Sequence, residues 1–228
     1  METPAFHAPA QTAEAPKPFQ LLAPVSPDSF YDIIQELERR PIPVNKYRTN
    51  SGEGRSVAFG FVNKRCQPPD LSRLCWQRPY LYNLLLEYGR KHVPFTDWNA
   101  ITLNQNYKAD PHRDRGNVGL SYLVAFGDYQ GGQLRVHETD ASGTYDIRHQ
   151  PLLFDGAKIL HSVSAFEGNR YSLVYYKLSR PSAKKLEQYT PVQLPKGWVL
   201  EYTDEEGKTR ILKRGSGLPH PLAGRVKG

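Results

Sequence analysis

Short alternating segments separated by turn residues are the feature that most constrains the fold of this chain. From about residue 99 onward such segments follow one another, and glycine, aspartate, asparagine or serine stands at the breaks between them. The predicted strands cover residues 99–108, 118–126, 132–138, 144–149, 151–154, 158–164 and 170–178. Many short strands of this kind bury their apolar faces by closing into a sandwich, a jelly roll or a barrel.

Two predicted helices precede these strands. The first begins at Ser26-Pro27-Asp28, which combines a capping residue, a proline suited to the first turn and an acidic side chain, and it ends before Pro41. The second runs from about Pro79 to His92 and carries a leucine-rich stripe. The fold class predicted from these patterns is α+β and mainly β, with N-terminal helices supporting a jelly roll.

The ends of the chain differ in composition from the middle. Residues 1–24 are rich in alanine and proline and are predicted to form a disordered tail. Residues 25–180 are predicted to form one domain, and residues 181–228 a C-terminal extension with a flexible end. Within that extension, the pattern from Trp198 to Leu212 predicts a β-hairpin that turns at Asp204–Gly207.

The overall charge narrows the classes of partner. The chain has 30 Lys and Arg against 23 Asp and Glu, a formal net charge of +7. This balance favours a polyanionic partner such as nucleic acid, although a basic soluble protein without such a partner has the same composition. No run approaches the roughly 18 apolar residues of a membrane helix, and the N-terminus lacks a signal-peptide pattern. We therefore expect an intracellular protein with no membrane partner, nuclear if the source is eukaryotic.

A candidate metal site stands in the tripeptide His112-Arg113-Asp114. In an extended segment, side chains two residues apart point to the same face, so His112 and Asp114 are expected to converge. His161 follows in another predicted strand. Two histidines and one carboxylate that leave coordination positions open form the facial triad of non-haem Fe(II) oxygenases.

A candidate anion site stands in the last predicted strand. Alternation places Arg170 and Ser172 on the face shared by Val174 and Tyr176. If that face lines a cavity, the buried guanidinium needs an anion, because an unpaired buried charge costs several kcal/mol. A small dicarboxylate ligand supplies one through a bidentate contact. The polar segment from Asn104 to Tyr107, just before the metal pair, is expected to contact the same ligand.

The order of these motifs resembles the 2-oxoglutarate- and Fe(II)-dependent dioxygenase superfamily. That family's H-x-D pair, Y-x-G-G-x-L turn, distal histidine and R-x-S pair correspond here to His112/Asp114, Tyr129–Leu134, His161 and Arg170/Ser172. The resemblance implies a double-stranded β-helix that holds Fe(II) on His112, Asp114 and His161. It also implies that Arg170, Ser172, Tyr107 and Asn104 bind 2-oxoglutarate, which is converted to succinate as O2 is consumed. Ascorbate is an alternative reductant.

The substrate prediction depends on Asn117. The stretch His-Arg-Asp-Arg-Gly-Asn that ends at Asn117 resembles the H-R-D-x-x-N stretch of TET/JBP-type dioxygenases, in which the asparagine contacts a flipped pyrimidine base. With Arg113, Arg115 and Arg48 as backbone contacts, the resemblance implies oxidation of a nucleic-acid base, a 5-methylpyrimidine at its methyl group. A turn-forming role for Asn117 is the alternative.

Two other functions remain open at this point. The first is hydroxylation of a protein side chain such as proline, since the arginine spacing after His161 resembles the prolyl-hydroxylase pattern. The second is a non-catalytic barrel that uses the cavity only for binding. The N-x-Y pattern of AlkB-type enzymes is absent, because Gln105 stands two residues before Tyr107.

Overall fold

A long antiparallel sheet carries the architecture. The computed structural model describes residues 19–43, 52–64, 67–137, 142–178, 199–203 and 209–213. Within this part of the chain, seven strands pair in the order β1-β9-β5-β12-β4-β2-β3. Their bounds are β1 Phe19–Leu21, β2 Gly52–Lys64, β3 Gln67–Leu71, β4 Ala100–Ala109, β5 Asn117–Phe126, β9 Leu152–Phe154 and β12 Tyr171–Leu178.

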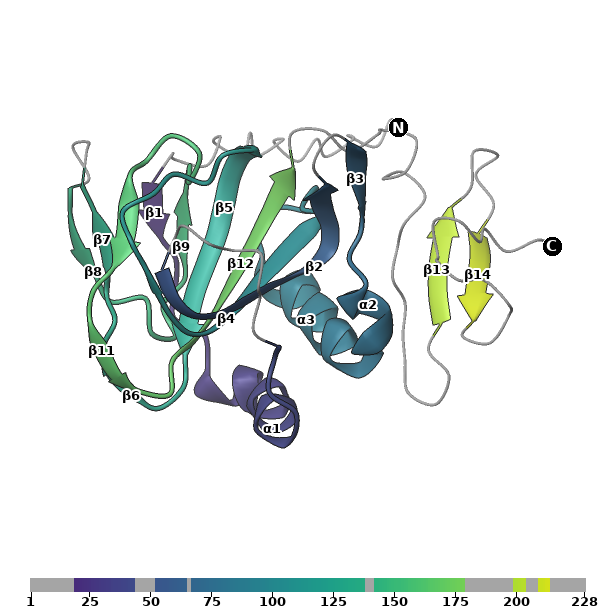
Figure 1. Cartoon of the computed structure of the whole chain (residues 1–228), viewed down its shortest axis with the longest axis horizontal. Helices are drawn as coiled ribbons and strands as arrows, with labels where there is room; N and C mark the ends of the chain where they lie inside the picture. The colour runs from purple at the N-terminus through teal and green to yellow at the C-terminus, as the bar shows by residue number, and fades with distance from the viewer. Residues whose placement is uncertain are drawn as a thin grey trace, which may run out of the picture.

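Shorter strands form two further sheets. One pairs β10 (His161–Val163), β7 (Leu134–Val136) and β8 (Gly143–Tyr145), and the other pairs β11 (Phe166–Gly168) with β6 (Tyr129–Gly131). Figure 1 shows β6, β7, β8 and β11 gathered at the left of the molecule, away from the helices α2 and α3. This jelly-roll arrangement of antiparallel strands is the predicted double-stranded β-helix.

The helices begin where the sequence predicts and cover one face of the long sheet. A 3₁₀ turn, Pro27–Phe30, leads into α1 (Tyr31–Arg39), and the Ser26 hydroxyl accepts a hydrogen bond from the backbone N–H of Asp28 at 3.3 Å. The short α2 (Leu74–Gln77) precedes α3 (Pro79–His92), whose last turn is basic and therefore complements the helix dipole. No helix in the described ranges is long and apolar enough to cross a membrane.

Alternation along the strands separates the core from the cavity. Ile101 and Tyr175 are fully buried on the face covered by the helices, where the Tyr175 hydroxyl donates to the Leu85 carbonyl at 2.6 Å. Their neighbours along the same strands, Thr102 and Val174, face the other way and line a cavity. The helical layer thereby holds rigid the strands on which the cavity residues stand.

Some predicted boundaries were wrong. The predicted disordered tail is too long, because Phe19–Leu21 form β1 and pair with β9, and Phe19 packs on Tyr145 with ring centroids 4.8 Å apart. Three residues are too few to show periodicity, so only the docking on β9 reveals this strand. The strands β3, β6 and β11 and the helix α2 were not predicted either, and they have only three to five residues each.

The C-terminal hairpin was predicted. Val199–Thr203 (β13) pairs with Thr209–Lys213 (β14) in an antiparallel two-stranded sheet. Residues 1–18 of the predicted tail, and most of the predicted extension, lie outside the described residues.

Candidate metal centre

The three predicted metal ligands converge. One ligand atom from each of His112, Asp114 and His161 lies within 4.8 Å of the others. The Asp114 carboxylate stands between the two imidazoles, with Oδ1 3.5 Å from Nε2 of His112 and Oδ2 4.0 Å from Nε2 of His161. The structure therefore brings together two nitrogen donors and one oxygen donor from segments that are far apart in the sequence.

Backbone hydrogen bonds hold these segments side by side. His112 and His161 exchange two of them, N–H to O at 2.9 and 3.0 Å, and the Asp114 N–H donates to Gly156 O at 2.8 Å. A Cβ on Gly156 would stand 2.7 Å from Asp114 Oδ2, so a larger residue there would force the carboxylate to shift. Residues 112–114 are not part of a regular strand, because only His112 forms a bridge and Asp114 lies outside any ladder.

The second ring nitrogen of each histidine sets its tautomer. Nδ1 of His112 lies 2.7 Å from Asp110 O, and Nδ1 of His161 lies 2.9 Å from Ile159 O. A carbonyl only accepts, so each Nδ1 carries the proton and each Nε2 lone pair is directed at the carboxylate. Burial lowers the pKa of His161, which also favours the neutral ring that a metal requires. This donor set fits Fe(II).

A cavity of about 490 Å³ joins the metal ligands to the other predicted site residues. Besides the triad, its lining includes Asn104, Tyr107, Arg113, Arg115, Asn117, Arg170 and Ser172. Apolar side chains such as Leu134 and Phe154 complete the wall. Arg48 lies outside the described residues.

Arg170 is the most constrained polar residue of the cavity. Its side chain is fully buried, its Nε donates to Gly132 O at 3.1 Å, and its guanidinium lies 5.5 Å from the Tyr129 ring centroid. A Cβ on Gly132 would stand 2.7 Å from Arg170 Cδ, which explains the second glycine of the predicted turn. The guanidinium also lies 5.7 Å from the centroid of the Phe166 ring.

No acidic side chain among the described residues forms an ion pair with Arg170. Asp155 pairs instead with Lys158 at 2.9 Å. Burial lowers the pKa of the Arg170 guanidinium, because the charged form is desolvated, while Tyr129 and the Asp146 carboxylate act in the opposite direction. A guanidinium nevertheless stays protonated, and no carboxylate of the described residues forms an ion pair with it. The carboxylate of a ligand such as 2-oxoglutarate fits a site of this kind.

Ser172 and Asn104 form a polar pair next to Arg170. They face each other across β12 and β4, and Asn104 Nδ2 donates to Ser172 Oγ at 3.0 Å. The Asn104 carbonyl oxygen is buried and has no partner in the described part of the chain. The two side chains thus offer hydrogen-bonding groups to a ligand held by Arg170.

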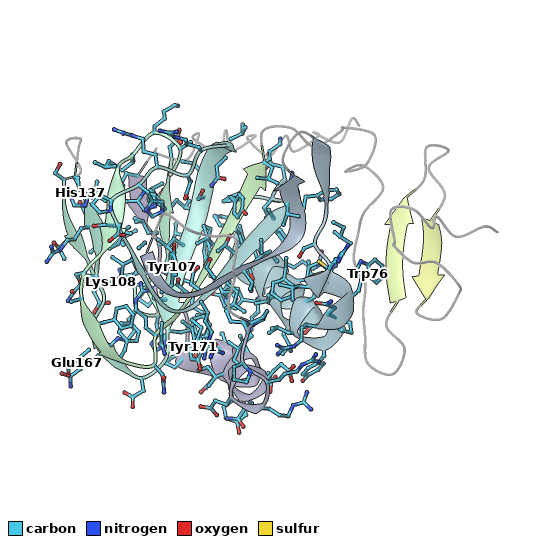
Figure 2. All side chains as sticks on the ribbon, viewed as in Figure 1. Trp76, Tyr107, Lys108, His137, Glu167 and Tyr171 are labelled. Carbon is cyan, nitrogen blue, oxygen red and sulfur yellow. The ribbon has the colours of Figure 1, made fainter. Side chains whose placement is uncertain are left out.

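Tyr107 enters the cavity because of an irregularity in β4. Thr102 and Asn104 show the normal two-residue alternation, but Asn106 has a positive φ of 50° and the β2–β4 register shifts beside it. The irregularity reverses the alternation, so that Tyr107 lines the cavity and is 7% exposed (Figure 2). Asn106 Oδ1 also accepts a hydrogen bond from the backbone N–H of Arg170 at 2.7 Å. The only signal in the sequence is an asparagine, a residue that tolerates this conformation.

The three remaining predicted residues stand at the rim. Arg113 and Arg115 are exposed, and Arg113 Nε donates to Lys158 O at 2.9 Å. Asn117 is half-buried, and its amide nitrogen lies 3.4 Å from Asp114 Oδ2. His137, which was not predicted to bind metal, directly follows β7 and contacts Ser162 of β10 through its Nε2 at 2.7 Å (Figure 2).

Comparison with known proteins supports the fold alone. No protein-family model matches the sequence, and no curated protein matches it. Among solved structures, NgTET1 in complex with 5mC DNA is 16% identical, with a TM-score of 0.51 over 72% of this chain and 75% of that one.

Two further solved structures are less similar. OsALKBH1 is 16% identical over 72% of this chain and 100% of that one, with a TM-score of 0.47. A Pseudomonas putida prolyl-4-hydroxylase is 16% identical over 71% and 92%, with a TM-score of 0.45. Fold and site together define the class as a double-stranded β-helix protein with a two-histidine, one-carboxylate centre.

Proposed function

We propose that this chain is an Fe(II)- and 2-oxoglutarate-dependent dioxygenase. The observation that carries the proposal is a single cavity that contains both a facial triad and a buried arginine, with which no carboxylate in the described ranges forms an ion pair. The triad alone is compatible with many metals, and the arginine alone with many anions. Together they match a ligand that has a carboxylate at one end and metal-binding oxygens at the other.

The residues have distinct roles in this proposal. The two Nε2 atoms and the Asp114 carboxylate hold the iron, while Arg170 and Ser172, with Asn104 and Tyr107, bind the distal carboxylate of 2-oxoglutarate. When both are bound, iron and 2-oxoglutarate supply the oxidation: O2 is consumed, succinate and CO2 are released, and one oxygen atom enters a substrate C–H bond. The apolar wall keeps water away from the reacting atoms.

We propose a nucleic-acid base as the substrate, a 5-methylpyrimidine oxidised at its methyl group. The rim of the cavity presents Arg113 and Arg115 to solvent, and the formal net charge is +7, which supports contact with a phosphate backbone. The likeness of the fold to NgTET1, whose solved structure contains 5mC DNA, supports the same substrate class. A base must leave its stack to reach such a cavity.

The experiment incubates the full chain with Fe(II), 2-oxoglutarate and a 5-methylcytosine oligonucleotide, with and without ascorbate. Succinate and the modified nucleoside are measured by mass spectrometry, with His112→Ala as the blank. Oxidised 5-methylcytosine that forms only with the unaltered protein supports the proposal. If the protein neither binds Fe(II) nor turns over 2-oxoglutarate, the chain is a binding barrel instead.

A parallel assay decides between base and protein substrates. A proline-rich peptide pool replaces the oligonucleotide, and DNA binding is titrated against salt. Each backbone contact contributes close to one unit of slope in a plot of log affinity against log salt. Hydroxylated peptide together with no DNA binding at low salt would refute the base assignment and leave the reaction class intact.

A further inference from the structure

We propose that Asn117 is a positioning residue that holds the Asp114 carboxylate in place for the metal. The inference rests on the iron centre of the proposed function. It assigns to Asn117 a role that differs from the one its sequence motif predicts.

A tight turn sets the position of Asn117. The Asn117 N–H donates to Asp114 O at 3.2 Å, which closes a four-residue turn. Gly116, the third residue of that turn, has a φ of +102°, a conformation that favours glycine in type II turns. Since Asn117 is the last residue of this turn and the first of β5, the backbone itself returns its side chain toward Asp114.

The amide of Asn117 is directed at the metal site. Nδ2 lies 3.4 Å from Asp114 Oδ2 and 3.4 Å from Oγ of Ser121, a fully buried residue of β5. An amide nitrogen has two protons, and these two acceptors account for both of them. A contact from this amide nitrogen to a base would therefore have to break the contact with Asp114 or with Ser121.

The two oxygens of the carboxylate have different surroundings. Oδ1 faces His112 Nε2 at 3.5 Å, whereas Oδ2 lies 3.4 Å from the Asn117 amide nitrogen. The hydrogen bond to Oδ2 restricts rotation of the carboxylate about its last torsion. A metal ligand that is oriented before binding needs no reordering when the metal arrives, so the Asn117 contact strengthens metal affinity.

The test measures metal affinity in the absence of nucleic acid. Mn(II), which is stable in air, is titrated into the full chain. The concentration of free Mn(II) is measured by electron paramagnetic resonance. We compare Asn117→Ala, which removes the amide, with Asn117→Leu, which keeps a side chain of similar volume but no donor. Val118→Ala, at an exposed neighbouring position, is the matched control. Melting temperatures of the metal-free proteins establish that each variant is folded.

Both Asn117 variants are expected to raise the Mn(II) dissociation constant by about 10- to 100-fold, while the control stays within about twofold. If Asn117→Leu binds Mn(II) as the unaltered protein does, volume and not hydrogen bonding is what matters, and the inference is wrong. Unchanged affinity in both variants with a raised KM for the oligonucleotide would restore the base-contacting role. Failure of the unaltered protein to bind Mn(II) would refute the proposed function instead.

Discussion

Replacing Arg170 with methionine tests whether the charge of Arg170 binds a ligand or stabilises the fold. The side chain is fully buried, and no carboxylate of the described residues pairs with it. Methionine retains much of the volume but carries no charge. We expect Arg170→Met to abolish 2-oxoglutarate binding and to leave the unfolding free energy of the ligand-free protein unchanged or higher.

The magnitudes follow from the contacts of Arg170. The substitution loses one hydrogen bond to Gly132 O, which leaves a carbonyl unpaired at a cost of about 1–3 kcal/mol. It also removes an unpaired buried cation, whose desolvation costs several kcal/mol, so the sum is close to zero or favourable. For the bound state, loss of one partner of a buried charge pair costs about 3–5 kcal/mol. That cost corresponds to about 10²- to 10⁴-fold in the dissociation constant of 2-oxoglutarate.

Calorimetric titration of 2-oxoglutarate into the Mn(II)-loaded proteins measures the affinity, and urea unfolding of the ligand-free proteins measures the stability. At 100 times its dissociation constant the ligand should stabilise the unaltered protein by about 2.7 kcal/mol and the variant hardly at all. Retention of full 2-oxoglutarate affinity would refute the reasoning. A loss of about 3 kcal/mol or more in the ligand-free protein would refute it as well, because Arg170 would then have an internal anionic partner.

Three further outcomes are expected. Gly132→Ala should weaken 2-oxoglutarate binding at least tenfold in the same titration, since its Cβ would displace Arg170 and its φ of +70° strains an alanine. Burial lowers the pKa of His161 below the ordinary 6.5. As the pH falls, His161 is therefore protonated at a higher pH in the unfolded state than in the folded state. Stability is therefore complete above about pH 6.5 and falls as the pH drops below it, which urea unfolding at several pH values will show. Glu36→Ala should lower the unfolding free energy by about 3–5 kcal/mol in urea, because it leaves the buried Arg78 unpaired.

Each of these outcomes has a control. Gly143→Ala has a normal φ and only ordinary contacts, so 2-oxoglutarate affinity should be unchanged; equal losses in both glycine variants would contradict the steric argument. A pH dependence that is identical in His161→Ala would assign the effect to other histidines whose pKa is lowered, such as the half-buried His149. Glu38→Ala, at an exposed position of α1, should cost less than about 0.5 kcal/mol.

Much of the site could be predicted from the sequence because its parts are local motifs. The spacing of His112 and Asp114, the glycine turn before β7 and the alternation of Arg170 with Ser172 each depend on backbone geometry within a few residues. The helices α1 and α3 were predicted for the same reason, from local caps and apolar stripes. The short strands β1, β6 and β11 were missed, since their pairing partners are distant in the chain. The strand β3, which pairs with the neighbouring β2, was missed as well.

Other features of the site depend on contacts between distant segments. The reversal of alternation at Asn106, which places Tyr107 in the cavity, involves β2 and the backbone of Arg170. The contacts of Asn117 with Asp114 and Ser121, by contrast, are local, because these partners stand three and four residues away.

By itself, therefore, the sequence determined which side chains are available to a metal and to an anion, and the order in which they occur. Only the tertiary structure decided that they share one cavity, that the histidine Nε2 atoms converge on a single carboxylate, and that no carboxylate of the described residues forms an ion pair with Arg170. The physical reason is that charge compensation and ligand geometry depend on distances between strands. The alternation of residues along one strand gives no information about those distances.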